Sequence, residues 1–159
     1  MKRDVIRVYA DSSVFGGSFD EEFAEDSQKF FDQVQTGRFA LLLSSVLVAD
    51  ELGEAPQAVR KLFDAFLPAM ELVRMDTDAL ALQRAYLSAG IVGPKSSDDA
   101  LHVALATIAE GDLIVSWNFR HIVHFEKVPR YNAVNRLSGW RELAIHSPKE
   151  VIVYEDEDV

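Results

Sequence analysis

The fold is decided by the stretch Val5-Ile6-Arg7-Val8-Tyr9-Ala10-Asp11, which lies near the start of the chain. Its first six residues are largely apolar and rich in β-branched side chains, which is typical of a strand buried in a sheet. The interior of such a strand does not accommodate a charge, yet this run ends in a carboxylate. Asp11 therefore stands at the carboxyl end of the first predicted strand, where a polar group can meet a ligand.

Short apolar strands and helices alternate along the rest of the chain. Further strands are predicted at 39–43, 72–75, 113–116 and 143–146, and helices at 21–35, 44–52, 56–66, 76–89 and 96–110, with a loop over 16–20 and mixed loop and helix over 119–142. This alternation predicts an α/β fold in which a mainly parallel β-sheet carries helices on both faces. In right-handed crossovers the strand carboxyl ends and the helix amino ends share one edge of the sheet.

The composition is that of one globular domain without thiol chemistry. The 159 residues suffice for a sizeable core, and 48% of them are hydrophobic. Cysteine is absent, which excludes a disulfide framework, a thiolate metal site and a cysteine nucleophile. No stretch approaches the roughly 18 apolar residues of a membrane helix. No signal peptide is visible, so we expect a cytoplasmic protein that does not associate with a membrane.

The charge of the chain is negative and unevenly distributed. A net charge of −10 argues against broad, non-specific binding of nucleic acid. Residues 119–149, however, carry six basic and two acidic side chains. This segment is a candidate for contacts with a nucleic-acid backbone, although a scattered, solvated surface explains it equally well.

Three carboxylates far apart in the sequence are predicted to meet at one edge of the sheet. Asp11 ends the first strand, Glu51 lies in the helix after the second strand, and Asp99 opens the helix before the strand at 113–116. Asn118 directly follows that strand. Carboxylates brought together from several elements are what a hard metal ion needs.

Most of these residues also have a purely structural interpretation. Asp11 could be a helix N-cap or a turn residue, and Asp99 could form a capping box with the serine three residues before it. Asn118 could cap a turn. Glu51 is harder to explain in this way, because a covered glutamate without a partner is costly. Spacing alone does not separate it from Asp50, which is adjacent and points about 100° away.

The histidines and aromatic residues near these positions are interpreted as structural. His102 lies on an otherwise apolar helix and is expected to be buried and hydrogen-bonded. His121 and His124 could pair on a metal only with a third ligand nearby. Trp117 and Phe119 are expected to pack against the core, although an aromatic side chain beside a site can also stack on a base.

The joint pattern resembles the PIN-domain family of metal-dependent ribonucleases, which includes VapC-type toxins. The resemblance covers nearly the whole chain and rests on blocks at 9–13, 44–52, 99–106, 113–121 and 147–151. It selects Glu51 over Asp50 and Asp99 over Asp98. Ser116-Trp117-Asn118-Phe119 is similar to the form found in one bacterial subgroup. The resemblance implies a PIN-like nuclease domain over 1–154 and an acidic tail over 155–159.

The resemblance also implies a metal-dependent endoribonuclease that hydrolyses RNA phosphodiester bonds, as the toxin of a type II toxin–antitoxin pair does. Asp11, Glu51 and Asp99 would hold Mg²⁺ or Mn²⁺, which would activate a water and offset charge on the phosphate. Asn118 stands where many family members have a fourth acid, so the number of metals is left open. As a catalytic residue, Asn118 would orient a water or a phosphate oxygen. The implied partners are an RNA substrate, an antitoxin protein and a second copy of the chain in a homodimer.

Two other functions fit parts of the pattern. A phosphatase of the haloacid-dehalogenase type also has an acid after its first strand and further acids late in the chain. It needs a second aspartate where this chain has Ser13, and its late acids should follow a strand and not open a helix. The other alternative is a catalytically impaired PIN-like module that binds RNA or a protein, and Asn118 is the feature that favours it.

Overall fold

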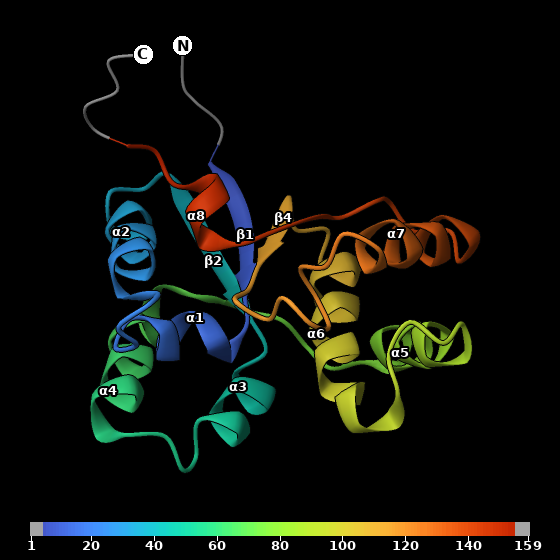
Figure 1. Cartoon of the computed structure of the whole chain (residues 1–159), viewed down its shortest axis with the longest axis horizontal. Coiled ribbons are helices and arrows are strands. Elements are labelled where there is room, and N and C mark those ends of the chain that lie inside the picture. The colour runs from blue at the N-terminus through green and yellow to red at the C-terminus, as the bar shows by residue number, and fades with distance from the viewer. Residues whose placement is uncertain (1–4, 155–159) are drawn as a thin grey trace.

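A five-stranded parallel sheet forms the centre of the molecule. The structure is a computed structural model that describes residues 5–154, apart from the side chain of Ser45 (Figure 1). The predicted acidic tail at 155–159 lies outside the described residues. The strands are β1 (Ile6–Ala10), β2 (Phe39–Leu43), β3 (Glu71–Leu72), β4 (Leu113–Val115) and β5 (Ala144–His146), in the spatial order β3-β2-β1-β4-β5. All neighbouring strands pair in parallel, which confirms the predicted α/β fold.

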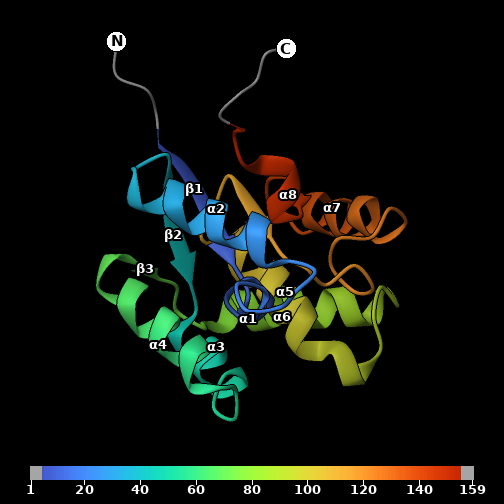
Figure 2. The same ribbon diagram turned by 60° about the vertical axis from the view of Figure 1, so that its left-hand side comes forward.

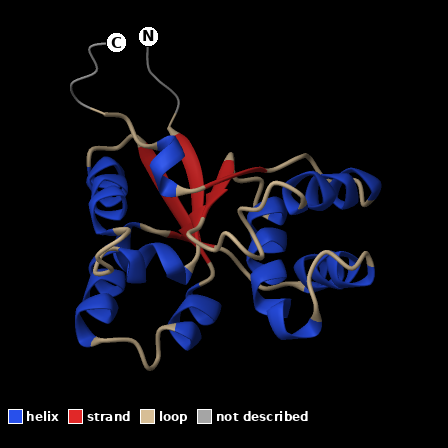
Figure 3. Cartoon of the chain, viewed as in Figure 1, coloured by secondary structure: helices blue, strands red, loops and turns tan. Residues whose placement is uncertain are grey.

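Helices cover both faces of this sheet, as Figures 1 and 3 show. One face carries α1 (Ser12–Gly17), α2 (Ala24–Gln35), α4 (Gln57–Phe66) and α8 (Pro148–Val151), and the other carries α5 (Thr77–Ser88), α6 (Ser97–Ile108) and α7 (Lys127–Leu137). The helix α3 (Ser45–Glu51) lies beyond the carboxyl end of β2, and β3 lies at the edge of the sheet beside β2 (Figure 2). Two short 3-10 turns, η1 (Leu67–Ala69) and η2 (Pro94–Ser96), precede β3 and α6. No helix within residues 5–154 combines the length and apolar character needed to span a bilayer.

The alternation of side chains along β1 divides the core into two apolar clusters. Val8 and Ala10 belong to the cluster under α1, α2 and α4, which also holds the edge-to-face aromatic pair Phe30 and Phe31. Tyr9 points to the opposite cluster, under α5, α6 and α7. All five side chains are nearly inaccessible to water. The central strand is thus buried on both faces, as expected for a parallel sheet between two helical layers.

The amino ends of two helices form as the sequence predicts. Ser44 caps α3 by accepting a hydrogen bond from the Leu47 amide at 3.3 Å. Asp76 caps α5 in the same way, with the Ala79 amide at 3.0 Å. Each cap satisfies a backbone donor that has no partner within the helix.

The short helix α1 replaces the front of the loop predicted over 16–20. Asp11 begins this helix, because its carboxylate accepts from the Ser13 amide at 3.1 Å. Gly17 ends it in close contact with Trp117, since a Cβ built on Gly17 would lie 2.7 Å from the indole ring. The cap confirms the interpretation of Asp11 as a helix N-cap. The contact between Gly17 and Trp117 joins segments far apart in the sequence, which the local pattern does not reveal.

Candidate active site

Asp11 is buried at the carboxyl end of β1 and is held by two serines. Only 4% of the residue is exposed. Its Oδ1 accepts from Ser13 Oγ at 2.5 Å, and its Oδ2 accepts from Ser116 Oγ at 2.6 Å. Burial raises the pKa of the Asp11 carboxyl, while the charge of His102 and the two serine hydroxyls oppose that rise. The two serines therefore orient the carboxylate, but the groups around it offset only part of the effect of burial on its pKa.

The same serines join the end of β1 to the segment that follows β4. Ser13 Oγ accepts from the Trp117 amide at 2.9 Å, and Ser116 Oγ accepts from the Asn118 amide at 2.9 Å. Ser116 itself directly follows β4, which pairs with β1. The backbone after β4 is thereby fixed against Asp11.

Glu51, and not Asp50, faces the interior at the end of α3. The Glu51 side chain is 24% exposed, and its Oε1 lies 2.7 Å from His102 Nε2. His102 is 1% exposed, and its Nδ1 lies 2.7 Å from the hydroxyl of Tyr9. Burial lowers the pKa of His102, but the Glu51 hydrogen bond and the charges of nearby acids outweigh it, so the net shift is upward.

Asp99 lies in the first turn of α6 and is partly buried, whereas Asp98 is exposed. The predicted capping box is wrong, because Ser96 makes no side-chain cap to this helix. Burial raises the pKa of Asp99, and the negative charges of Asp11 and Glu51 add to the rise. Asp11 and Glu51 are thus close enough to Asp99 to affect its ionisation.

Asn118 closes a turn immediately after β4. Its Oδ1 accepts from the amides of Arg120 at 3.2 Å and His121 at 2.8 Å. These bonds agree with the interpretation of Asn118 as a residue that caps a turn. Its role in orienting a water or a phosphate oxygen stays a prediction.

The chemistry of the donor set suits a hard cation. All three acids offer oxygen ligands, and a bound cation would offset the repulsion and burial that raise the pKa values of Asp11 and Asp99. Over residues 5–154, however, no three or more histidine, aspartate or glutamate side chains form a group that could hold a metal ion. Glu51 is instead bonded to His102. The residue types fit Mg²⁺ or Mn²⁺, and binding would require the carboxylates to shift from the positions described.

An aromatic cluster adjoins Asn118. Trp117 is buried, donates from Nε1 to Ser27 Oγ at 2.8 Å, and stacks on Phe23 with 4.3 Å between ring centroids. Phe119 rests edge-on against Trp117 but is 48% exposed. The prediction of core packing is therefore confirmed for Trp117, whereas Phe119 packs against Trp117 on one side and leaves much of its ring exposed.

The basic segment at 119–149 separates into two parts. Arg141 donates to the backbone oxygen of Glu110 at 3.2 Å, just past the carboxyl end of α6. Asp99 lies at the amino end of that twelve-residue helix, so about 18 Å of helix separates the two ends. Lys127, in contrast, has its Nζ 3.3 Å from His121 Nδ1, and His121 is close enough to Asp99 to lower its pKa. Only the first part of the segment is near the acids.

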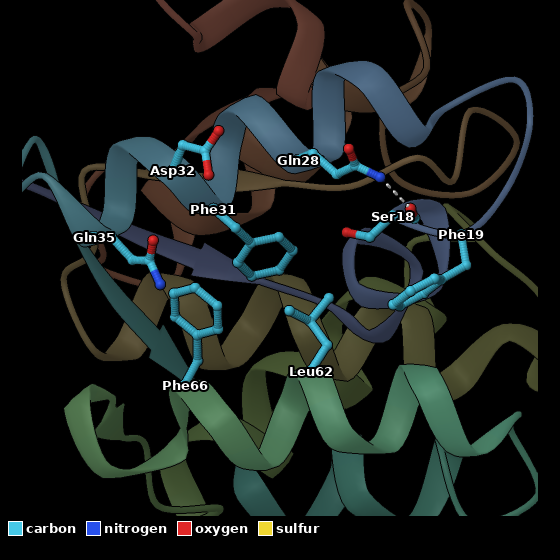
Figure 4. Close-up of a pocket in the computed structure, with 8 residues that line it drawn as sticks. All are labelled: Ser18, Phe19, Gln28, Phe31, Asp32, Gln35, Leu62 and Phe66. Atoms are coloured by element: carbon cyan, nitrogen blue, oxygen red, sulfur yellow. Dashed lines mark hydrogen bonds between the residues drawn. The ribbon is translucent and has the colours of Figure 1, made fainter.

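Two hollows lie away from the three acids. One, of about 310 Å³, opens between α1, α2 and α4 and is lined by Ser18, Phe19, Gln28, Phe31, Asp32, Gln35, Leu62 and Phe66 (Figure 4). Gln28 spans part of its rim by donating to the Ser18 backbone oxygen at 2.9 Å. The other, of about 570 Å³, lies beside the exposed ring of Phe125. Neither of these two hollows contains Asp11, Glu51 or Asp99.

His102 is the site residue whose role the sequence did not reveal. Its burial and hydrogen bonding were predicted and are confirmed. Its bond to Glu51 was not foreseen, although one signal was present. His102 stands three residues after Asp99 on the same helix, and residues at that spacing lie on one helical face.

Comparison with known proteins supports the architecture. The chain has an α/β fold consistent with a PIN-like arrangement of a parallel sheet and flanking helices. Among solved structures, it is similar to a chain of the VapBC2 complex from Rickettsia felis, crystallised with a DNA fragment from the promoter of the pair. The TM-score is 0.59 and the identity 14%, over 89% of this chain and 98% of that chain. No protein-family model matches the sequence. No curated protein matches it either.

Proposed function

We propose that this protein is a metal-dependent endoribonuclease. The observation that supports it is the proximity of Asp11 and Glu51 to Asp99, whose pKa their negative charges help to raise, in a PIN-like fold. Carboxylates with raised pKa values are common at functional sites. No protein nucleophile is required for metal-assisted hydrolysis.

The three acids would hold Mg²⁺ or Mn²⁺, which when bound would lower the pKa of a water and offset charge on the scissile phosphate. Ser13 and Ser116 orient Asp11 for this task through their hydroxyl groups. Asn118 follows β4 beside them and would orient a water or a phosphate oxygen through its amide. One or two ions would satisfy this donor set, which carries three carboxylates and no fourth.

The RNA would approach along the first part of the basic segment. Arg120 is exposed, and Lys127 and His121 lie together near Asp99. These groups would contact phosphates, and the exposed ring of Phe119 would stack on a base. The negative charge of the remaining surface would disfavour binding elsewhere.

Cleavage of a labelled single-stranded RNA tests this proposal. The purified chain should cut the RNA with Mg²⁺ or Mn²⁺, not with EDTA, and the Asp11→Asn variant should be inactive with either metal. Glu51→Gln should also be inactive, whereas Asp50→Asn, which alters the exposed neighbour, should keep wild-type activity. Cleavage that persists in EDTA, or an active Asp11→Asn variant, would refute the proposal.

We also propose that the chain is the toxin of a toxin–antitoxin pair and forms a homodimer. The support is its structural similarity to a chain of the VapBC2 complex, which was crystallised with DNA from the promoter of the pair. Light scattering on the purified protein measures whether it is dimeric. Growth arrest on expression, relieved by the product of a neighbouring gene, tests the toxin assignment.

The alternative is a PIN-like module that binds RNA or a protein without cutting. It is favoured by the engagement of Asn118 Oδ1 in a turn and of Glu51 by His102. RNA binding without cleavage at any Mg²⁺ or Mn²⁺ concentration would support it. The phosphatase alternative is weakened because Asp98 and Asp99 lie within α6 and do not follow a strand. Trapping of phosphate on Asp11 would revive it.

A further inference from the structure

We propose that His102 is a positioning residue that holds the Glu51 carboxylate in register with Asp11 and Asp99. This inference rests on the proposed function, and it names a residue beyond the acids themselves. His102 would touch neither the RNA nor the metal. It acts through Glu51, and Tyr9 in turn holds His102.

A chain of polar contacts links the three elements that carry the acids. His102 Nε2 lies 2.7 Å from Glu51 Oε1, and His102 Nδ1 lies 2.7 Å from the Tyr9 hydroxyl. These contacts join α3, which carries Glu51, to α6 and to β1.

Each link in this chain lies close to one of the acids. Tyr9 stands two residues before Asp11 on the buried end of β1, and His102 stands three residues after Asp99 on α6. Glu51 is itself the last link. A shift of α3 relative to β1 and α6 would break these contacts. The series of hydrogen bonds therefore sets the position of Glu51 relative to the other two carboxylates.

The direction of the hydrogen bonds follows from the groups involved. An ionised carboxylate only accepts, so His102 Nε2 must carry a hydrogen whether the ring is neutral or charged. In the neutral ring, Nδ1 is then free to accept from the Tyr9 hydroxyl. Both ring nitrogens have partners, which explains why a residue 1% exposed in an apolar cluster is tolerated there.

Simple packing does not account for this residue. The surrounding positions of α6 are buried apolar side chains, such as Leu101, Val103 and Leu105, and an apolar residue at 102 would suit that cluster. Burial of a histidine costs free energy unless both ring nitrogens form hydrogen bonds. The arrangement therefore stabilises one orientation of Glu51 and not the core as a whole.

The test compares Mn²⁺ affinity across variants of the full-length protein. His102→Leu should weaken Mn²⁺ binding by roughly tenfold to a hundredfold, as loss of a partner of a metal ligand does. It should lower kcat more than it changes KM. His102→Gln, whose amide can still donate to Glu51, should recover part of both losses. In combination with Glu51→Gln, His102→Leu should add little further loss.

Asn135→Leu provides the matched control. Asn135 is fully buried beside the same cluster and is bonded to the Tyr86 hydroxyl, but it contacts none of the three acids. It should lower the free energy of unfolding without weakening Mn²⁺ binding. If both variants weaken Mn²⁺ binding equally, or if His102→Leu leaves it unchanged, the positioning role is refuted.

A measurement on the metal-free protein separates this inference from the proposed function. Nuclear magnetic resonance of the histidine ring nitrogens should show Nε2 of His102 protonated in the wild type, with its shift altered in Glu51→Gln. A wild-type protein that neither binds Mn²⁺ nor cleaves RNA, yet shows this signature, would refute the nuclease and leave His102 as the residue that holds Glu51. An unprotonated Nε2 would overturn the inference itself.

Discussion

Ser116 Oγ donates a hydrogen bond of 2.6 Å to Asp11 Oδ2 across a sequence separation of 105 residues. This bond ties the end of β4 to the end of β1 at the candidate site. It satisfies one oxygen of a carboxylate that is almost completely buried. The site is therefore built into the core of the sheet and does not sit on a mobile surface.

Ser116→Ala should lower the free energy of unfolding by about 1–3 kcal/mol, because it removes a donor from a buried carboxylate. The Asn118 amide would lose its acceptor as well. Urea denaturation measures the change. Ser88→Ala, at an exposed position, should stay within about 0.5 kcal/mol of the wild type. A Ser116→Ala variant as stable as its control would show that the bond contributes nothing.

Asp99→Asn should reduce metal-dependent RNA cleavage by at least about a hundredfold while the fold stays intact. The adjacent Asp98 is exposed, so Asp98→Asn should keep wild-type activity. Initial rates with Mn²⁺ and circular dichroism of both variants check this. Equal activity of the two variants would contradict the assignment of Asp99 to the site.

Asp99→Asn should also stabilise the metal-free protein at neutral pH. Burial and the charges of Asp11 and Glu51 raise the pKa of Asp99 in the folded state, above the value of about 3.9 in an unfolded chain. A group whose pKa is higher in the folded state stabilises the fold at pH values below its pKa in the unfolded chain. This stabilisation is lost as the pH rises through its pKa in the folded state. The gain in stability of Asp99→Asn over the wild type should therefore be largest at neutral pH and should vanish as the pH falls toward about 4.

Urea denaturation in EDTA at several pH values measures this dependence. Asp98→Asn should show no comparable change with pH relative to the wild type. An Asp99→Asn variant that is less stable than the wild type at neutral pH would mean that the carboxylate serves the fold and not a ligand.

Gly17→Ala should destabilise the protein by about 1–3 kcal/mol through overpacking. The added Cβ would lie 2.7 Å from the Trp117 ring and 2.8 Å from Ser27 Oγ. Gly16→Ala is the control, because nothing lies within 4 Å of its Cβ and alanine favours the helix. Equal stability of the two variants in denaturation curves would show that the Trp117 ring moves aside for the added Cβ without loss of stability.

Phe119→Ala should weaken binding of single-stranded RNA by about 1–3 kcal/mol if its ring stacks on a base. Phe125→Ala is the control, since that ring is 92% exposed but lies after the turn, away from Asn118. Fluorescence of an RNA carrying 2-aminopurine, measured in EDTA, reports binding without cleavage. Equal affinities of the two variants would exclude Phe119 from the RNA path.

Much of the fold was determined by local sequence. The β-branched run that forms β1 and the alternating strands and helices define a parallel sheet, because burial on both faces selects that composition. Ser44 and Asp76 mark helix starts through hydrogen bonds to residues three positions away. These features need only neighbours in sequence. The choice of Glu51 and Asp99 over their acidic neighbours required the family resemblance, and the bond of Glu51 to His102 and the partial burial of Asp99 agree with it.

Only the tertiary structure decided how the acids are held. Ser116 meets Asp11 across 105 residues, His102 meets Tyr9 across 93 and Glu51 across 51. The close approach of Trp117 to Gly17, at the end of α1, likewise joins segments far apart in the sequence. Local patterns record periodicity, burial and capping, whereas hydrogen bonds of this range appear only when sheet order and helix packing bring the ends of β1, β4, α3 and α6 together.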